Sequence, residues 1–342
     1  MSEPLTKLSR VLDALLQFIR FPAFGFTAML PLLSADTTGQ PLTARQMLGI
    51  IGVALAFHSF CYVLNDVIDL PLDRTQALRM DAPLVRGLIR PGSALAFALL
   101  QVPVALIVTA WMGGGRESYV ALSVGFVLMA AYNLLGKRTA LPPVTDVIQG
   151  VAWGAMVFFG AGLRPGSITS LTVYLFAFVV MYIILINGVH GSLRDLTNDL
   201  TWGMRSTAIL LGARPRNAEQ LVIPPRLRLY AYTLQVFTLG LLFWPLFENL
   251  FGYSPVAWAA TLIALLLLSA RCLHILAMIL SPNTRQADLA RAVGAYLFAS
   301  LSSLVVLFAL HLEPERLIVL LIACLVPLLP NRVRHVASAL KA

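Results

Sequence analysis

The chain has 342 residues, of which 58% are hydrophobic and only 12% are charged, and its mean hydropathy is +0.82. Its formal charge is +9 at pH 7, from 25 basic and 16 acidic side chains. Soluble domains carry about 25% charged residues, so this composition excludes a soluble enzyme and a nucleic-acid-binding protein. It also excludes a disordered chain and a disulfide scaffold, because the three cysteines all lie within apolar runs.

The apolar residues gather in segments of the length that crosses a membrane, which is about 20 residues. Ten such segments lie near residues 15–35, 45–65, 94–112, 118–135, 144–162, 170–190, 229–248, 254–280, 290–311 and 316–331. We therefore expect an all-α fold, a polytopic transmembrane bundle of nine to ten helices that forms a single domain over residues 1–342. We interpret the first segment as a retained span, because no small-residue cleavage site closes it.

The basic residues alternate between loops. Most lysines and arginines lie at the two ends of the chain and in the loops that follow the even-numbered segments. Cytoplasmic loops of membrane proteins are enriched in these residues. We therefore expect an integral protein of a bacterial cytoplasmic membrane, with both termini and these loops in the cytoplasm.

Six of the sixteen acidic residues fall in two of these loops. After the second segment the sequence is N-D-x-x-D-x-x-x-D, formed by Asn65, Asp66, Asp69 and Asp73. Offsets of 3, 4 and 7 residues place these side chains on one face if the helix continues past Pro71. A row of carboxylates repels itself, and a divalent cation relieves that repulsion. Mg²⁺ is favoured, because it binds one or two carboxylates, waters and substrate phosphates.

The second acidic cluster follows the sixth segment. There Asp195, Asn198 and Asp199 share a helical face. We predict that the two clusters hold two or more Mg²⁺ ions around one diphosphate, which the metals and nearby basic residues would neutralise as it leaves. The predicted metal ligands are Asn65, Asp66, Asp69, Asp73, Asp195 and Asp199. The alternative, solvated acids paired with neighbouring arginines, explains a single loop better than two similar loops on one expected side.

These motifs resemble the UbiA superfamily of membrane prenyltransferases. The resemblance is carried by Asn65-Asp66-x-x-Asp69-x-x-x-Asp73, by Pro83-Leu84-x-x-Gly87, by Tyr132 with Lys137-Arg138, and by the second motif, which ends in Gly203-Met-Arg205-Ser206-Thr207-Ala208-Ile-Leu-Leu-Gly212. This last string is similar to the 4-hydroxybenzoate polyprenyltransferase branch. The family often has Arg where this chain has Ala82, and Arg79 and Arg86 are the candidates to supply that charge.

The resemblance implies a helical bundle whose central cavity is capped by Asp-rich loops at about 65–93 and 190–228. It also implies Mg²⁺-dependent ionisation of a prenyl diphosphate, followed by alkylation of an acceptor that is often aromatic. On this interpretation Asp66, Asp69 and Asp195 are catalytic, and His190 is a candidate proton acceptor. The candidates for substrate contact are Asn65, Arg79, Arg86, Tyr132, Lys137, Arg138, Asn187, Arg194, Asp146 and His58.

Three functions compete at this point. The first is an aromatic prenyltransferase that takes its prenyl diphosphate donor from the lipid bilayer and uses a small aromatic acceptor. The second is a terpene cyclase of the same family, which needs no acceptor. The third is a transporter or channel. The expected position of the acids at the cytoplasmic mouth disfavours it, because transport sites usually lie near the bilayer midplane. No motif indicates a protein or nucleic-acid partner.

Overall fold

The computed structural model describes residues 12–76, 79–164, 168–217, 219–282 and 284–329. Almost all of the secondary structure in these residues is helical. The one sheet they contain is a hairpin of two antiparallel strands, β1 (Arg214–Pro215) and β2 (Leu221–Val222). The expected all-α class is confirmed.

Eight helices in the described residues are long and apolar enough to cross a membrane. They are α3 (Ala44–Ile68), α5 (Pro91–Trp111), α6 (Arg116–Leu135), α7 (Pro142–Ala161), α8 (Ser170–Leu185) with its continuation to Arg194, α12 (Pro225–Phe247), α13 (Pro255–Ile279) and α14 (Gln286–Ala309). A ninth span results if Leu12–Phe18 and Phe21–Asp36, which are bent by 53°, count as one. The bent pair includes the 3-10 turn η1 (Phe21–Ala23) and α2 (Phe24–Asp36). The chain is therefore an integral membrane protein with up to nine spans among the described residues.

The tenth predicted segment differs from the others. In the described residues it forms α15 (Pro314–Leu325), of 12 residues, and the short turn η4 (Val326–Leu328). A span needs about 20 residues, so α15 alone is too short, and residues 330–331 of the segment lie outside the described residues. Several helices begin at residues that commonly start helices. Thr43 and Gln46 form a capping box on α3, and prolines occupy the first turns of α5, α12 and α13.

The chain divides into two compact units. Unit 1 comprises Met1–Asn133, Met156–Ser167 and Pro314–Ala342, and unit 2 comprises Leu134–Ala155 and Ile168–Glu313. The expectation of a single domain stays a prediction. The first acidic motif belongs to unit 1 and the second to unit 2, so each motif is described within its own unit.

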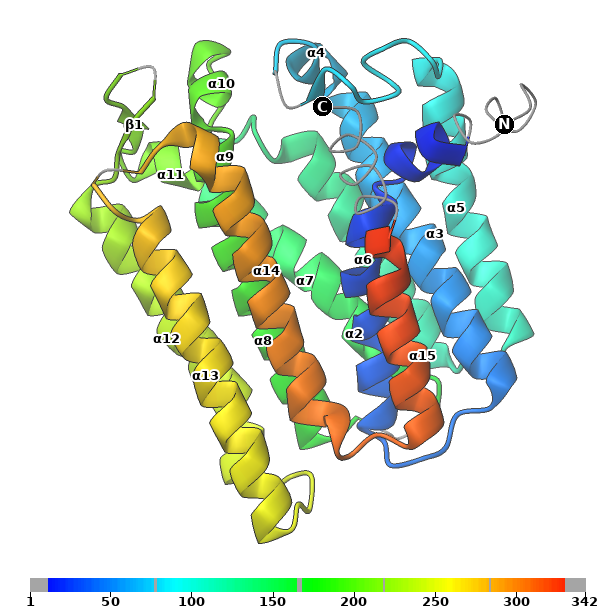
Figure 1. Cartoon of the computed structure of the whole chain (residues 1–342). Helices are drawn as coiled ribbons and strands as arrows, with labels where there is room; N and C mark the ends of the chain where they lie inside the picture. Colours follow the sequence, from blue (N-terminus) through cyan, green and yellow to red (C-terminus); the bar gives the residue numbers. More distant parts are fainter. Residues whose placement is uncertain (1–11, 77–78, 165–167, 218, 283, 330–342) are drawn as a thin grey trace, which may run out of the picture. The chain divides into compact units, whose positions relative to one another are not determined.

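In unit 1, α3 lies beside α5 and also packs against α2, which in turn packs against α15 (Figure 1). The contact of α2 with α15 is close, since a Cβ atom at Gly25 would lie only 2.9 Å from the Cα atom of Cys324. The buried carboxylate of Asp36 forms an ion pair with Arg316, which joins the same two helices.

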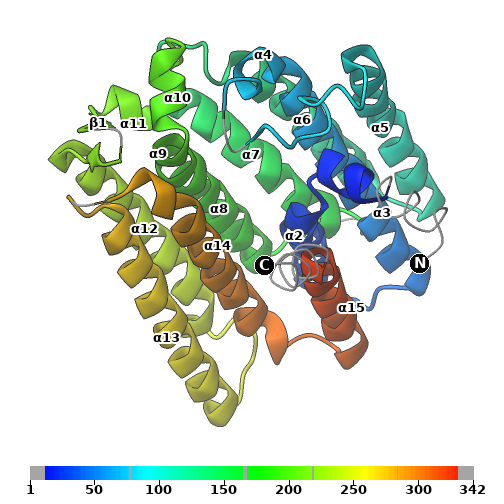
Figure 2. The same cartoon turned by 45° about the horizontal axis from the view of Figure 1, so that its top comes forward.

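In unit 2, α8 packs against α12, and α13 packs against α14. The short helices α9 (Ser192–Arg194), α10 (Leu196–Thr201) and α11 (Thr207–Leu210) and the hairpin lie at one end of these long helices (Figures 1 and 2). Glycine allows α7 to approach α8, because a Cβ atom at Gly150 would lie 2.9 Å from the carbonyl oxygen of Val180. The second acidic motif is therefore at the end of the unit that carries the irregular segments.

Candidate active site

The first acidic motif lies where α3 ends. Asp69 forms the junction between α3 and the short helix α4 (Leu70–Asp73), with φ −89° and ψ 3°. The helical hydrogen bonds continue through it, because the Asp69 amide donates to the Asn65 carbonyl and the Asp73 amide to the Asp69 carbonyl, both at 2.8 Å. Pro71 is tolerated because it lies in the first turn of α4, where its missing N–H leaves no interior bond unmade. The helical path thus continues past Pro71, which is the condition for the motif's side chains to share one face.

One arginine spans the first and last carboxylates of this motif. Arg79 Nη2 lies 2.6 Å from Asp66 Oδ1, and Arg79 Nε donates to Asp73 Oδ2 at 3.0 Å. The carboxylate side chains are 6% and 10% exposed. Asn65 donates to Asp69 Oδ2 at 3.1 Å. The prediction that Asp66 and Asp73 share a face is confirmed, since one guanidinium reaches both.

Arg20 also pairs with Asp66, and sequence reasoning missed this role. Its backbone is left-handed, with φ 49° and ψ 42°, a conformation that costs a non-glycine residue about 1–3 kcal/mol. Its guanidinium lies 5.1 Å from the centre of the Tyr62 ring, within cation–π range. The signal available in the sequence was an arginine inside the first apolar segment, since charged residues within spans usually serve a function.

His58 supports the Arg20 turn. Its Nε2 lies 3.3 Å from the Arg20 carbonyl oxygen, and its Nδ1 lies 2.8 Å from the Thr27 hydroxyl oxygen. A carbonyl can only accept, so Nε2 carries the hydrogen and Nδ1 accepts from Thr27. The side chain is fully buried. Both ring nitrogens of His58 are therefore hydrogen bonded within the protein, and its predicted contact with substrate stays a prediction.

The second acidic motif repeats this local design. α8 continues through the π-helical segment η3 (Ile186–Gly191) into α9, and Asp195 forms the junction with α10 at φ −94° and ψ 1°. The Asp199 amide donates to the Asp195 carbonyl at 2.9 Å. Asp69 and Asp195 thus have nearly the same backbone conformation, in the sparsely populated region where many active-site residues lie.

A lysine spans the two carboxylates of the second motif, as Arg79 does in the first. Lys137 Nζ lies 2.9 Å from Asp199 Oδ1 and 3.9 Å from Asp195 Oδ2. Arg194 donates two hydrogen bonds to Asp195, at 2.9 and 3.0 Å. The structure therefore brings Lys137 and Arg194 together with Asp195 and Asp199. The sequence marked all four as site residues, and their roles in binding metal or substrate stay predictions.

Burial changes the acidity of one carboxyl in each motif. It raises the pKa of Asp73, and the guanidinium of Arg79 opposes this rise. Burial likewise raises the pKa of Asp199, and the ammonium of Lys137 opposes it. Each motif thus keeps a desolvated carboxylate beside one cation, which partly compensates the buried charge.

A second polar cluster in unit 2 joins α7, η3 and the first residue of α11. The buried carboxylate of Asp146 accepts a hydrogen bond from Asn187 Nδ2 at 2.5 Å and another from the Thr207 hydroxyl. His190 is fully buried with its ring 4.3 Å from that of Tyr296, measured between centres. Neither ring nitrogen of His190 has a hydrogen-bond partner among the described residues.

Three other predicted contact residues lie at or near the surface. Arg86 is exposed. Arg138 is also exposed and donates to the carbonyl of Leu134 at 2.9 Å. Tyr132 is half-buried. Their roles in substrate binding stay predictions.

The carboxylate pairs fit Mg²⁺ in their chemistry. No group of three or more His, Cys, Asp or Glu residues in the described part of the chain is arranged to hold a metal ion. Mg²⁺ does not require three, because it binds proteins through one or two carboxylates and completes its shell with waters and substrate phosphates. Asp66 with Asp73, and Asp195 with Asp199, are close enough for one basic side chain to contact both members. The predicted ligand set stays a prediction.

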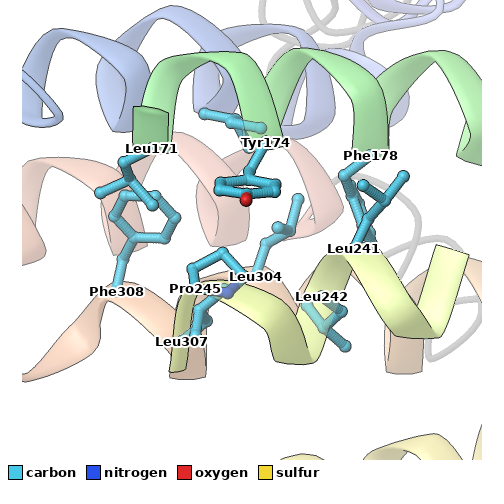
Figure 3. Close-up of a pocket in the computed structure, with 10 residues that line it drawn as sticks. Leu171, Tyr174, Phe178, Leu241, Leu242, Pro245, Leu304, Leu307 and Phe308 are labelled. Atoms are coloured by element: carbon cyan, nitrogen blue, oxygen red, sulfur yellow. The ribbon is translucent and has the colours of Figure 1, made fainter. Parts of the chain in front are cut away.

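An apolar pocket in unit 2 lies away from this chemistry. It is lined by residues of α8, α12 and α14, among them Leu171, Tyr174, Phe178, Pro245 and Leu304, whose side chains converge in Figure 3. Phe178 precedes Asp195 by 17 residues, about 25 Å at the helical rise of 1.5 Å per residue. The pocket is therefore not part of the acidic motif.

Comparisons with known proteins agree with the resemblance noted in the sequence. A 4-hydroxybenzoate octaprenyltransferase of Tolumonas auensis is 30% identical over 207 residues, which are 60% of this chain and 65% of that protein. The chain thus matches slightly less than two thirds of that relative's length.

Solved structures share the fold. A UbiA homolog from Aeropyrum pernix K1 matches with a TM-score of 0.63 and 16% identity, over 84% of this chain and 98% of that one. A UbiA homolog from Archaeoglobus fulgidus bound to GPP and Mg²⁺ matches with a TM-score of 0.57 and 16% identity, over 86% of this chain and 99% of that one. The profile of the UbiA prenyltransferase family covers residues 23–277. The chain therefore belongs to the UbiA prenyltransferase family.

Proposed function

We propose that this chain is a membrane prenyltransferase that uses Mg²⁺ to ionise a prenyl diphosphate and transfers the prenyl group to a small aromatic acceptor resembling 4-hydroxybenzoate. The observation that carries the proposal is the design shared by the two acidic motifs. In each, a long helix ends at an aspartate junction, and one basic side chain contacts two carboxylates. Such sites offer both metal ligands and cations for a diphosphate.

Asp66, Asp73, Asp195 and Asp199 would be the principal Mg²⁺ ligands, with Asn65 and Asp69 completing the first set. Bound there, Mg²⁺ would supply positive charge that stabilises the diphosphate as the bond between its oxygen and the prenyl C1 breaks. The leaving diphosphate keeps the electron pair, and the aromatic ring forms the new bond to C1.

The basic side chains would change partners in this reaction. Arg20, Arg79 and Lys137 now neutralise the carboxylates of the motifs. With a metal bound to the carboxylates, their N–H groups would be available to donate to diphosphate oxygens, and charge-assisted bonds of this kind are strong. Each of these residues would therefore neutralise the carboxylates of its own motif before the substrate binds and contact the diphosphate afterwards.

The aromatic acceptor must lose a ring proton after alkylation. His190 is the candidate to receive it, because its ring nitrogens have no hydrogen-bond partner among the described residues. It is fully buried beside Tyr296, so proton transfer from the acceptor would require a local opening around His190. The similarity to a 4-hydroxybenzoate octaprenyltransferase supports the choice of acceptor. We propose further that the acidic loops lie on the cytoplasmic side of a bacterial membrane, following the distribution of basic residues.

Product analysis tests this proposal. Purified protein in detergent receives Mg²⁺ and geranyl, farnesyl or geranylgeranyl diphosphate, each with and without 4-hydroxybenzoate, and products are identified by mass spectrometry. We expect diphosphate release together with a prenylated 4-hydroxybenzoate. A cyclic hydrocarbon or terpene alcohol formed without acceptor would show that the protein is a terpene cyclase and not a transferase. This alternative stays open because the chain has Ala82 where the family often has Arg. No diphosphate release from any of the three donors would contradict the proposal.

A further inference from the structure

The buried carboxylate of Asp146 has no role in the reaction as proposed above. It lies in the first turns of α7 and is 3% exposed. No basic side chain pairs with it in the described part of the chain, and its partners there are Asn187 and Thr207. A buried carboxylate is expensive unless it is hydrogen bonded. Its presence at this position therefore points to a task performed through these two partners.

The two partners lead to opposite sides of the second acidic motif. Asn187 belongs to η3, the π-helical segment that continues directly into α9 and Asp195. π-Helical turns are rare, and they occur frequently at functional sites. One extra residue in a turn rotates everything that follows by about 100° relative to an α-helix. The direction in which Asp195 points thus depends on η3 keeping its shape.

Thr207 leads to the basic side of the motif. Two residues before it, the Arg205 amide donates to the carbonyl of Lys137 at 3.1 Å. Lys137 is the residue whose ammonium contacts Asp195 and Asp199. Asp146 therefore connects, through one carboxylate, the segment that carries the acids and the segment that is bonded to the lysine.

Gly188 shows how closely the carboxylate fits against η3. A Cβ atom at this position would lie 2.7 Å from Asp146 Oδ2 and 3.5 Å from the Tyr230 hydroxyl oxygen. A side chain of any size at residue 188 would therefore displace the carboxylate. This close approach leaves no room for a ligand between Asp146 and η3.

We propose that Asp146 is a positioning residue, which fixes the carboxylates of the second motif relative to Lys137 by accepting hydrogen bonds from Asn187 and Thr207. This role replaces our expectation from the sequence that Asp146 contacts the substrate. The inference rests on the proposed function, because it takes Asp195 and Asp199 to be metal ligands.

A reciprocal exchange separates positioning from substrate contact. Asn187→Asp places two carboxylates against each other and removes the donor. Adding Asp146→Asn restores the pair in reverse, because the new amide at position 146 donates to the new carboxylate at position 187 while its oxygen still accepts from Thr207. Asp146→Asn alone is tolerated if the amide of Asn187 turns to present its oxygen. If the Asp146 carboxylate contacted substrate or metal instead, both variants that carry Asp146→Asn would lose that contact, and the exchange would not restore it.

Two readouts are measured on the full-length protein in detergent. Hydrogen exchange of residues 186–199 reports the shape of η3 and of the motif, and Mn²⁺ binding followed by electron paramagnetic resonance reports the metal site. Loss of an outer-shell partner typically lowers metal affinity by about 10–100-fold. Asn217→Asp is the matched control, because it adds the same charge at an exposed turn. The backbone amides of Glu219 and Gln220 donate to the Asn217 side-chain oxygen, and an aspartate there can still accept both hydrogen bonds.

We expect Asn187→Asp to accelerate exchange in residues 186–199 and to weaken Mn²⁺ binding by about tenfold or more. The double variant returns both readouts to nearly the wild-type values, and Asp146→Asn alone changes little. The inference is overturned if the double variant is not restored, or if Asn187→Asp behaves like the Asn217→Asp control. A wild-type protein that binds no Mn²⁺ would contradict the proposed metal site, and the exchange readout would still decide whether Asp146 positions the motif.

Discussion

Arg79 provides the most direct test of how charge is balanced in the first motif. It contacts both Asp66 and Asp73, whose side chains are 6% and 10% exposed, while its own side chain is 21% exposed. Arg79→Gln leaves Asp73 without its basic partner, whereas Asp66 still pairs with Arg20. We expect the protein to lose stability in the absence of a divalent cation.

The magnitude follows from the burial of the pair. Removing one partner of a fully buried ion pair costs about 3–5 kcal/mol, and an exposed pair contributes about 0–1 kcal/mol. Arg79 lies between these limits, so we expect a loss of about 2 kcal/mol. A cation that binds the folded state with a Kd of about 1 mM stabilises it by about 1.4 kcal/mol at 10 mM. At 10 mM Mg²⁺ the variant should therefore regain most of the stability that the wild type has without a divalent cation.

The assay is thermal unfolding in detergent, followed by tryptophan fluorescence in EDTA and in 10 mM MgCl₂. Arg74→Gln is the matched control, because it removes the same charge from an exposed position of the same loop. In EDTA the deficit of Arg79→Gln should also narrow as the pH falls. Burial raises the pKa of Asp73, so the penalty for its charge is present above that pKa and disappears on protonation. Equal midpoints for the two variants in EDTA, or an Arg79→Gln midpoint that 10 mM Mg²⁺ does not raise, would refute this reasoning.

Three further predictions concern single residues. His58→Ala should raise the KM for the prenyl diphosphate about tenfold, because it removes the hydrogen bond to the Arg20 carbonyl. His58→Gln keeps a donor to that carbonyl and should have a KM near the wild-type value. Equal increases in KM for both variants in steady-state kinetics would rule this out. Lys137→Met should lower kcat/KM for diphosphate release by about 100-fold, as loss of a charge-stabilising group does, and a change below about threefold would contradict the role of Lys137. His190→Gln should lower kcat about 100-fold with little change in KM; an unchanged kcat would remove His190 from proton transfer.

Much of the fold could be predicted from the sequence because its signals are local. A membrane span needs only a run of apolar residues, and the predicted segment 45–65 became α3 (Ala44–Ile68). The common face of Asp66 and Asp73 follows from the helical period alone. Pro71 does not disrupt it, because that proline lies in the first turn of a new helix. The tenth segment is apolar as expected, yet α15 has only 12 residues, because hydropathy does not determine where a helix ends.

The remaining parts of the site depend on contacts between distant residues. Arg20 and Asp66 are 46 residues apart in the sequence. Arg20 also adopts a left-handed backbone conformation that no residue preference indicates. Asp146 and Thr207 are 61 residues apart. The sequence predicted Asp146 only as a candidate for substrate contact, and the positioning role that we propose depends on its hydrogen-bond partners Asn187 and Thr207. Periodicity predicts which residues share a face, and it does not predict which faces meet.

The central claim is that the two acidic motifs bind the Mg²⁺ that ionises a prenyl diphosphate. The most direct measurement is the rate of diphosphate release from geranylgeranyl diphosphate by the wild-type protein, Asp66→Asn and Asp195→Asn, each with Mg²⁺ and with EDTA. The account predicts release by the wild type only with Mg²⁺, and a loss of about 100-fold or more in each variant while thermal unfolding shows that it remains folded. Wild-type release that persists in EDTA, or a near-normal rate in either variant, would contradict it.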